Sequence, residues 1–360
     1  MLRTIEIDLK YQPTIEQPPV QNSNELIQRA AQSDQPTVNH WRNIWIDLTQ
    51  KAKERFGNFA DKSIGKLHGI NRHKPAICIG SGPSLKNSIE ALRENRKLEH
   101  PVLTISCLHN FGYFEDEDCH ADYYLTLDSG DIIVDDIFES RKEKAEFYWE
   151  KTKDKTLLAT LATPPKLFDL WKGPIYLFNV IIPEKETQDK LQAIERFAHY
   201  IAPGGNALGG CVYVAKAIFG SDPIIFVGAD FCFDHNNTFH SYKTHYDTLG
   251  GFVTHPDVFG IPRSTWPSYL RFKYYLDWLA CNVPGHYISC SEGLLGAYKE
   301  GNIRQFKYMP LKDALLPYAM SERVYLQKID PMTGVVLGKD EIRLKDLFSN
   351  SQYPTDMTIY

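Results

Sequence analysis

The sequence predicts an α/β fold in which helices cover both faces of a doubly wound, mostly parallel sheet. Two observations predict it. Between residue 74 and about residue 320, strand-like runs alternate with helix-like stretches, and these runs are continuously apolar, as is typical of strands buried on both faces. The expected strands are 74–80, 101–107, 122–128, 156–162, 174–179, 223–230 and 286–291, and the main expected helices are 83–95, 187–200, 207–219 and 267–282.

Two flanking regions differ from this central domain of 74–320. Residues 1–73 begin with a proline-bearing polar stretch, which predicts an extended arm, and continue with apolar residues at helical spacing over 40–67. The prolines of the arm are Pro13, Pro18, Pro19 and Pro36. Residues 321–360 contain two β-like runs around Pro-Met-Thr-Gly. We therefore expect a helical N-terminal extension and a C-terminal β-hairpin within 323–344.

Composition limits the function. The 360 residues are 43% hydrophobic and 24% charged, as in an ordinary globular protein. The formal net charge of -5 argues against a general nucleic-acid binder. No run of about 18 apolar residues predicts a membrane span, and the N-terminus lacks the apolar stretch of a signal peptide. Seven scattered cysteines without a Cys-x-x-Cys pair indicate free thiols, so we expect a cytoplasmic protein.

The strongest local motif is Gly80-Ser81-Gly82-Pro83-Ser84, which lies between an expected strand and an expected helix. Gly80 and Gly82 permit unusual backbone angles and the close approach of a ligand, and Pro83 suits a first helical turn. Free N–H groups and the positive end of a helix dipole bind anions at such a turn. The loop is neither a Walker A motif nor a dinucleotide fingerprint. It predicts a phosphate site, with a tight turn that binds nothing as the alternative.

Two aspartates end expected strands. Asp128, followed by Ser129, ends the strand 122–128, and Asp230 ends the strand 223–230. Because ligands of doubly wound sheets bind outside the carboxyl ends of the strands, we expect both aspartates to face one crevice. Asp128 is predicted to hold a ribose hydroxyl, with a helix cap as the alternative. If the reaction needs Mg²⁺, Asp128 and Asp230 are its expected ligands.

Two further turns place small or polar residues at the same edge of the sheet. One precedes a helix rich in small residues, and the other follows the last expected strand; either is also explained as a simple turn. Their residues are Gly204, Gly205 and Asn206 in the first, and Ser291, Glu292 and Gly293 in the second. Both turns are predicted to contribute to nucleotide binding.

A polar loop over 231–259 is long enough to form a lid. It contains His240 and His245, and a histidine there can act as general base or acid near neutral pH. Surface histidines without a role are the alternative. No zinc is expected, because the spacing of the nearby cysteine and histidines fits no familiar zinc pattern. These residues are Cys232, His235, His240, His245 and His255.

The ordered set of motifs carries a resemblance that no single motif carries. The set comprises GSGPSL (80–85), the strand ending in Asp128, GGN (204–206), IIFVGADFCF (224–233) and ISCSEGLLGAY with MPLKDAL (288–315). It resembles the DUF115 family, which includes the MptE-like 6-hydroxymethylpterin diphosphokinases and the motility accessory factor (Maf) flagellin glycosyltransferases. The resemblance spans roughly residues 74–316. It departs from the family pattern at Gly-Ala-Asp-Phe-Cys (228–232) and at Ser-Cys-Ser-Glu-Gly-Leu (289–294).

The resemblance implies a Rossmann-like domain that handles a nucleotide or nucleotide sugar. It favours a glycosyltransferase with a donor of the CMP-nonulosonate type, whose nucleotide the glycine loop and Asp128 would hold. A lid histidine or Asp230 would then carry the proton. The alternatives are a diphosphokinase, which needs Mg²⁺ to bridge phosphates, and a non-catalytic binding or structural protein that keeps the fold. The expected partners are a small-molecule nucleotide donor, an acceptor that is a protein, a glycan or a pterin, and a second copy in a homo-oligomer.

Overall fold

A nine-stranded parallel sheet organises the chain, so the predicted α/β, doubly wound fold is confirmed. In the computed structural model the strand order is β11-β10-β7-β1-β2-β3-β4-β5-β6, and all neighbouring strands run parallel. The strands are β1 (Ala76–Ile79), β2 (Leu103–Cys107), β3 (Tyr123–Thr126), β4 (Thr156–Thr160), β5 (Ile175–Val180), β6 (Tyr200–Ile201), β7 (Ile224–Val227), β10 (Tyr287–Ser289) and β11 (Lys307–Tyr308). All seven expected strands are present. The structure describes residues 23–131, 133–134, 145–182, 184–196, 198–236, 238–241, 252–296, 306–319, 323–329 and 336–343.

Helices cover both faces of this sheet, because its central strands are apolar on both sides. In β1, Ile77 and Ile79 pack into one buried cluster, and Ala76 and Cys78 pack into another. The first face carries α2 (Ile89–Lys97), α3 (Phe111–Asp116), α5 (Ala145–Glu150), α6 (Pro165–Leu170) and α10 (Leu311–Ala319). The second carries α8 (Ala207–Tyr213), the π-helical segment η7 (Val214–Ile218) and α9 (Pro267–Asn282).

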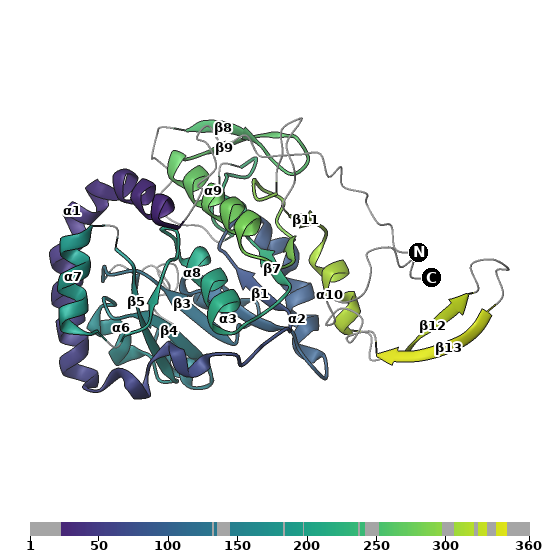
Figure 1. Cartoon of the computed structure of the whole chain (residues 1–360), viewed down its shortest axis with the longest axis horizontal. Coiled ribbons are helices and arrows are strands. Elements are labelled where there is room, and N and C mark those ends of the chain that lie inside the picture. Colours follow the sequence, from purple (N-terminus) through teal and green to yellow (C-terminus); the bar gives the residue numbers. More distant parts are fainter. Residues whose placement is uncertain are drawn as a thin grey trace.

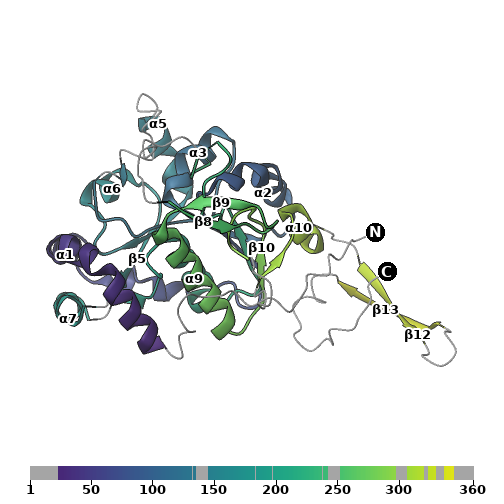
Figure 2. The ribbon, with the colours of Figure 1, turned by 90° about the horizontal axis from the view of Figure 1, so that it is seen from above.

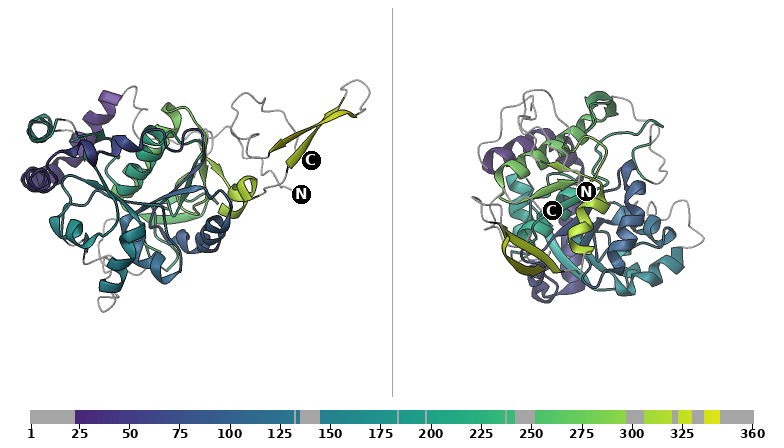
Figure 3. Two further views of the ribbon diagram at one scale, coloured as in Figure 1. Left: turned by 90° about the horizontal axis from the view of Figure 1, so that it is seen from below. Right: turned by 90° about the vertical axis from the view of Figure 1, so that its right-hand side faces the viewer.

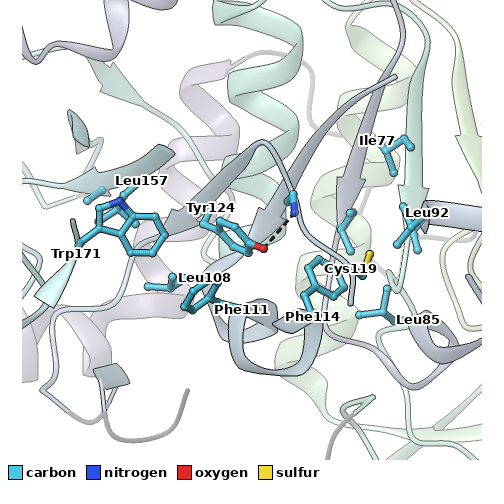
Figure 4. Packing of buried hydrophobic residues seen from close by; sticks show 14 of the residues in the cluster. Ile77, Leu85, Leu92, Leu108, Phe111, Phe114, Cys119, Tyr124, Leu157 and Trp171 are labelled. Atoms are coloured by element: carbon cyan, nitrogen blue, oxygen red, sulfur yellow. Dashed lines mark hydrogen bonds between the residues drawn. The ribbon is translucent and has the colours of Figure 1, made fainter. Parts of the chain in front are cut away.

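The core of the first face contains a group of aromatic side chains among its aliphatic ones (Figure 4). Phe111 of α3 packs edge-on against Tyr124 of β3, with ring centroids 5.2 Å apart. The Tyr124 hydroxyl accepts a hydrogen bond of 3.1 Å from the Ala121 N–H, which satisfies its polar end inside the core. This packing fixes the helices that connect the first strands.

The N-terminal region is more helical than the sequence predicts. Helix α1 spans Ser23–Phe56, so the expected extended arm is wrong for residues 23–39, where the helix continues through Pro36. Proline removes one helical hydrogen bond. The following turn packs against α7 (Lys185–Ile194), where Val38 and Leu191 belong to one small buried cluster, and this packing stabilises the helix. The two helices lie side by side in Figure 1 and Figure 2. Residues 1–22 lie outside the described part of the chain.

Short helical turns complete the connections. The helical stretch expected over 40–67 breaks at Gly57, whose φ of 64° ends α1, and resumes as two 3-10 turns. The 3-10 turns among the described residues are η1 (Phe59–Asp61), η2 (Ile64–Leu67), η3 (Pro83–Ser88), η4 (Leu108–Asn110) and η6 (Lys151–Asp154).

Two antiparallel hairpins lie outside the main sheet. The hairpin β8 (Val253–Pro256) and β9 (Pro262–Thr265) was not expected from the sequence, which indicated a lid loop there. The C-terminal hairpin β12 (Arg323–Ile329) and β13 (Val336–Arg343) confirms the predicted ribbon, and it stands away from the sheet in Figure 3. Among the described residues, no helix is both long and apolar enough to cross a membrane.

Candidate functional site

The strand order reverses between β1 and β7. From β1 the chain adds strands on one side out to β6 and then returns to place β7 on the other side of β1. Ligands of doubly wound sheets bind at the carboxyl ends of the strands where such a reversal occurs. The loops 80–84 and 228–230 follow β1 and β7 at this point, and we call this region the switch-point edge.

The two loops contact each other through their backbones. The Gly80 N–H donates to the Val227 carbonyl (2.8 Å) and the Gly82 N–H to the Gly228 carbonyl (2.9 Å). A Cβ on Gly80 would lie 2.5 Å from the Gly228 carbonyl oxygen, and Gly228 itself has a φ of 61°. Glycine is therefore required at these positions for the two loops to pack, whatever ligand they bind.

Asp230 fastens the loops together. Its carboxylate accepts hydrogen bonds from the Ser84 N–H and the Ser84 hydroxyl, both 2.6 Å long. The side chain is buried, and burial raises the pKa of Asp230 to about 6, although the bonds from Ser84 oppose that shift. The carboxylate thus caps the start of η3 from the neighbouring strand.

This arrangement leaves few backbone amides of the glycine loop for the predicted phosphate site. The N–H groups of Gly80, Gly82 and Ser84 are bonded inside the protein, and Pro83 has none. Among the described residues, the Ser81 N–H is the loop amide left without a partner. Phosphate binding by this loop stays a prediction, and its hydrogen-bond donors must come largely from other groups.

The residue after Asp230 has an unusual backbone. Phe231 has a φ of 53°, a left-handed conformation that is strained for a bulky residue and is often found at functional sites. Its carbonyl accepts a hydrogen bond from the Thr265 hydroxyl at the end of β9. The β8–β9 hairpin is therefore tied to the switch-point edge.

The turn after β10 joins the same region. The Ser291 hydroxyl accepts a hydrogen bond of 2.8 Å from the Ala229 N–H, and a Cβ on Gly293 would lie 2.3 Å from the Asp230 Cα. Ser291 and Gly293 are buried by these contacts, whereas Glu292 is exposed between them. The structure thus brings together the first predicted loop, Asp230 and the turn 291–293.

Asp128 lies farther along the same edge. It follows β3, which is three positions from β7 in the sheet, so at about 4.8 Å per strand the two aspartates belong to strands roughly 14 Å apart. Asp128 is partly exposed, and its N–H donates a hydrogen bond of 3.2 Å to the Thr126 hydroxyl. The Ser129 hydroxyl is buried, with no partner in the described part of the chain.

This spacing bears on metal binding. Asp128 and Asp230 do not converge on one ion, and both oxygens of Asp230 already accept bonds from Ser84. Within the described residues, no three His, Cys, Asp or Glu side chains are grouped as a metal site. Of the two predicted Mg²⁺ ligands, Asp128 therefore suits the ion better, because its carboxylate is partly exposed and does not bind Ser84. Phosphate oxygens of a substrate would complete the coordination.

The turn 204–206 begins helix α8. The Asn206 side chain caps the helix by accepting a bond of 2.9 Å from the Gly209 N–H. Gly204 and Gly205 have φ values of 68° and 88°, and a Cβ on Gly204 would overlap the Tyr275 ring of α9. Their contribution to nucleotide binding stays a prediction, because packing against α9 explains both glycines.

His240 lies at the switch-point edge. The next residue, Ser241, donates its N–H to the Ser81 carbonyl at 2.8 Å. Burial, together with a smaller effect of the nearby His109, lowers the pKa of His240 to about 3. Such an imidazole is a weak base at neutral pH, which weakens its predicted role as a general base. His245 lies outside the described residues.

Comparison with known proteins identifies a family that matches this chain. The family described as "6-hydroxymethylpterin diphosphokinase MptE-like" matches residues 50–236, slightly more than half of the 360 residues. The chain belongs to this MptE-like family. The matched region includes β1 to β7 and both loops of the switch-point edge, and it confirms the family resemblance of the motifs.

The fold of this MptE-like chain also resembles a solved glycosyltransferase. The similar structure is the Maf glycosyltransferase from Magnetospirillum magneticum AMB-1, with a TM-score of 0.50 and 15% sequence identity. The match covers 74% of this chain and 39% of that one, so the chain spans well under half of the Maf protein. No curated protein matches the chain in sequence. At this identity the likeness concerns the fold alone.

Two polar residues of the MptE-like site were missed in the sequence. His109 and Asn110 follow β2, and the Asn110 side chain donates to the Gly80 carbonyl (3.0 Å). Its Oδ1 is buried with no partner among the described residues. Their position directly after an apolar strand is the same signal that singled out Asp128 and Asp230.

Proposed function

We propose that this MptE-like chain is a nucleotide-dependent glycosyltransferase that binds a nucleotide-activated sugar, of the CMP-nonulosonate type, at the switch-point edge. Family membership and the strand reversal at β1 and β7 support a nucleotide substrate at this position. The observation that carries the choice of reaction is the separation of Asp128 from Asp230.

The separated carboxylates favour glycosyl transfer over diphosphoryl transfer. Diphosphoryl transfer develops charge on a chain of phosphates and relies on Mg²⁺ held against them. In this chain Asp230 is bonded to Ser84, and Asp128 is three strands away. A CMP-type donor carries a single phosphate, whose departure needs less charge neutralisation. If Mg²⁺ takes part, Asp128 and the donor phosphate would hold it, and the ion would neutralise that phosphate.

In the proposed reaction an acceptor hydroxyl oxygen bonds to the anomeric carbon of the sugar. The bond from that carbon to the phosphate oxygen breaks, and the phosphate oxygen leaves with the bonding electrons. The acceptor proton passes to a base, for which His245 remains the predicted group because the low pKa of His240 does not suit the task. Asp128 and Asn206 are the predicted contacts to the nucleotide.

The first test is a thermal-shift screen of the whole chain. The ligands are CMP, CDP, UDP, ATP and their sugar conjugates, each with and without Mg²⁺. A ligand at about one hundred times its Kd stabilises the folded chain by about 2.7 kcal/mol. We expect a cytidine nucleotide to give the largest shift, and we expect its CMP-sugar to release CMP when an acceptor is added.

The matched variants are Asp128→Asn at the carboxyl edge and Asp154→Asn at the amino edge, where Asp154 is exposed just before β4. Asp128→Asn is expected to weaken the nucleotide shift, and Asp154→Asn to leave it unchanged. A shift by ATP that depends on Mg²⁺ would favour the diphosphokinase alternative, to which the family description also points. Absence of any nucleotide shift would instead favour a non-catalytic protein.

A further inference from the structure

Two histidines lie beside the glycine loop, because the residue after each of them makes a hydrogen bond to one of the first two residues of the loop. His109 precedes Asn110, whose side chain donates to the first carbonyl of the loop at 3.0 Å. His240 precedes Ser241, whose N–H donates to the second carbonyl at 2.8 Å. The two imidazole rings lie 6.4 Å apart between centroids and are tilted by 44°. Two separate chain segments therefore position this histidine pair against one loop.

The spacing suits an oxygen atom shared by the two rings. With hydrogen bonds of about 2.8 Å, two rings that bond the same oxygen have centroids at most about 8 Å apart. Two cations that the structure describes near the switch-point edge are already paired: Lys86 with Asp234 (3.6 Å) and Arg263 with Asp257 (2.8 Å). The loop amides are also largely used within the protein. An anion at this edge would thus find donors on the histidine pair, next to the Ser81 N–H and the Ser241 hydroxyl, which have no partner among the described residues.

The charges around the histidine pair indicate its protonation state. His109 is the group whose charge acts on His240, and burial lowers the pKa of His240 to about 3. The acidic groups that the structure describes on the surrounding elements include Asp230, hydrogen-bonded to Ser84, and Asp234, paired with Lys86. Asp257 is paired with Arg263, and Glu292 is exposed in the turn after β10. Without a ligand, His240 is therefore neutral at pH 7. An anion within a few ångströms reverses this balance, because it favours the protonated imidazole.

We propose that His109 and His240 together bind a phosphate or diphosphate group and that the pair takes up a proton when the anion binds. The inference rests on the proposed function for the identity of the ligand, since the phosphate belongs to the nucleotide donor. It also gives His240 a role other than that of a base, because its task is to stabilise the charge that the leaving phosphate carries.

Isothermal titration calorimetry of the whole chain tests the proposal without a known donor sugar. Pyrophosphate and CMP are titrated separately at pH 7 in buffers with different ionisation enthalpies, which gives the number of protons exchanged. We expect uptake of about one proton per site. By linkage, the affinity then falls about tenfold for each unit of pH above 7.

The variants are His109→Gln and His240→Gln, with His120→Gln as the matched control. His120 is also half-buried, with a pKa lowered to about 4 by burial, but it lies at the amino edge of the sheet just before β3. Each variant of the pair is expected to weaken binding by about ten- to a hundredfold and to abolish proton uptake. His120→Gln is expected to match the wild type.

Three results would overturn the proposal: no binding of either anion to the wild-type chain, binding without proton uptake, or unchanged affinity in both variants of the pair. If His240→Gln does not fold, proton uptake by the wild type and the affinity of His109→Gln still decide. Nucleotide shifts without proton uptake would leave the proposed function standing and refute the histidine pair. If pyrophosphate binds with proton uptake but no nucleotide raises the melting temperature, the histidine pair stands and the proposed function is refuted.

Discussion

The substitution Asp230→Asn separates the charge of this side chain from its hydrogen bonds. In the structure the buried carboxylate accepts two bonds from Ser84. An asparagine keeps an oxygen for the Ser84 N–H, and its amide group can donate to the Ser84 hydroxyl. The variant is therefore expected to keep the two loops together while it removes the buried negative charge.

The size and sign of the effect follow from the pKa of Asp230. Burial raises it from 3.8 to about 6, so folding disfavours the ionised form. The stability that protonated Asp230 contributes is fully present below pH 3.8 and is lost as the pH rises through 6. A shift of about two pKa units corresponds to about 3 kcal/mol. The wild type is thus expected to lose about 3 kcal/mol relative to Asp230→Asn between acidic and mildly basic pH.

Urea unfolding at several pH values between 3.5 and 8 (about half a unit apart) measures this difference. Subtracting the variant from the wild type cancels the titration of all other groups. Asp154→Asn, at an exposed position, is the control and should show no such trend. A difference that stays constant with pH, or a wild type that gains on the variant as pH rises, would refute the reasoning.

Two further predictions concern packing. Gly82→Ala is expected to lower the free energy of unfolding by roughly 1–3 kcal/mol, because the added Cβ would lie 2.7 Å from the Gly228 carbonyl oxygen. The control is Gly65→Ala, whose Cβ would have its nearest neighbours at 3.3 and 3.8 Å. This control is expected to lower the free energy of unfolding by less. Equal losses in urea unfolding would contradict this. Asp277→Leu should cost about 3–5 kcal/mol by leaving the buried Lys273 ammonium unpaired, whereas Lys273→Met with Asp277→Leu should restore most of the loss. A double variant no more stable than Asp277→Leu would contradict that account.

The strands of the sheet could be predicted because burial on both faces leaves a direct trace in the sequence. The expected runs, such as 74–80 or 223–230, are mainly apolar, and each contains an observed strand. Helix α9 begins and ends where expected, with Pro267 at its first turn. The C-terminal hairpin was visible from its turn residues.

Elements that depend on distant contacts could not be predicted in this way. Helix α1 continues through Pro36 because later residues pack against α7, and local propensity argues against a helix there. The β8–β9 hairpin lies in a stretch whose prolines and polar residues indicate a loop. Its order depends on ties to the rest of the molecule, among them the bond from Val258 to the Gly293 carbonyl.

The candidate site shows a deeper limit of sequence reasoning. A glycine permits the close approach either of a ligand or of a second backbone. The motif Gly-Ser-Gly-Pro-Ser alone does not distinguish between these two neighbours. Here the neighbour of Gly80 and Gly82 is the backbone of the loop after β7, and Asp230 takes the amide of Ser84 that was expected to meet phosphate. The motif lies where the sheet reverses its strand order, and the sequence predicted only a turn at the carboxyl edge of the sheet. The donors that we propose for an anion include residues such as His109, which the fold alone brings beside the motif.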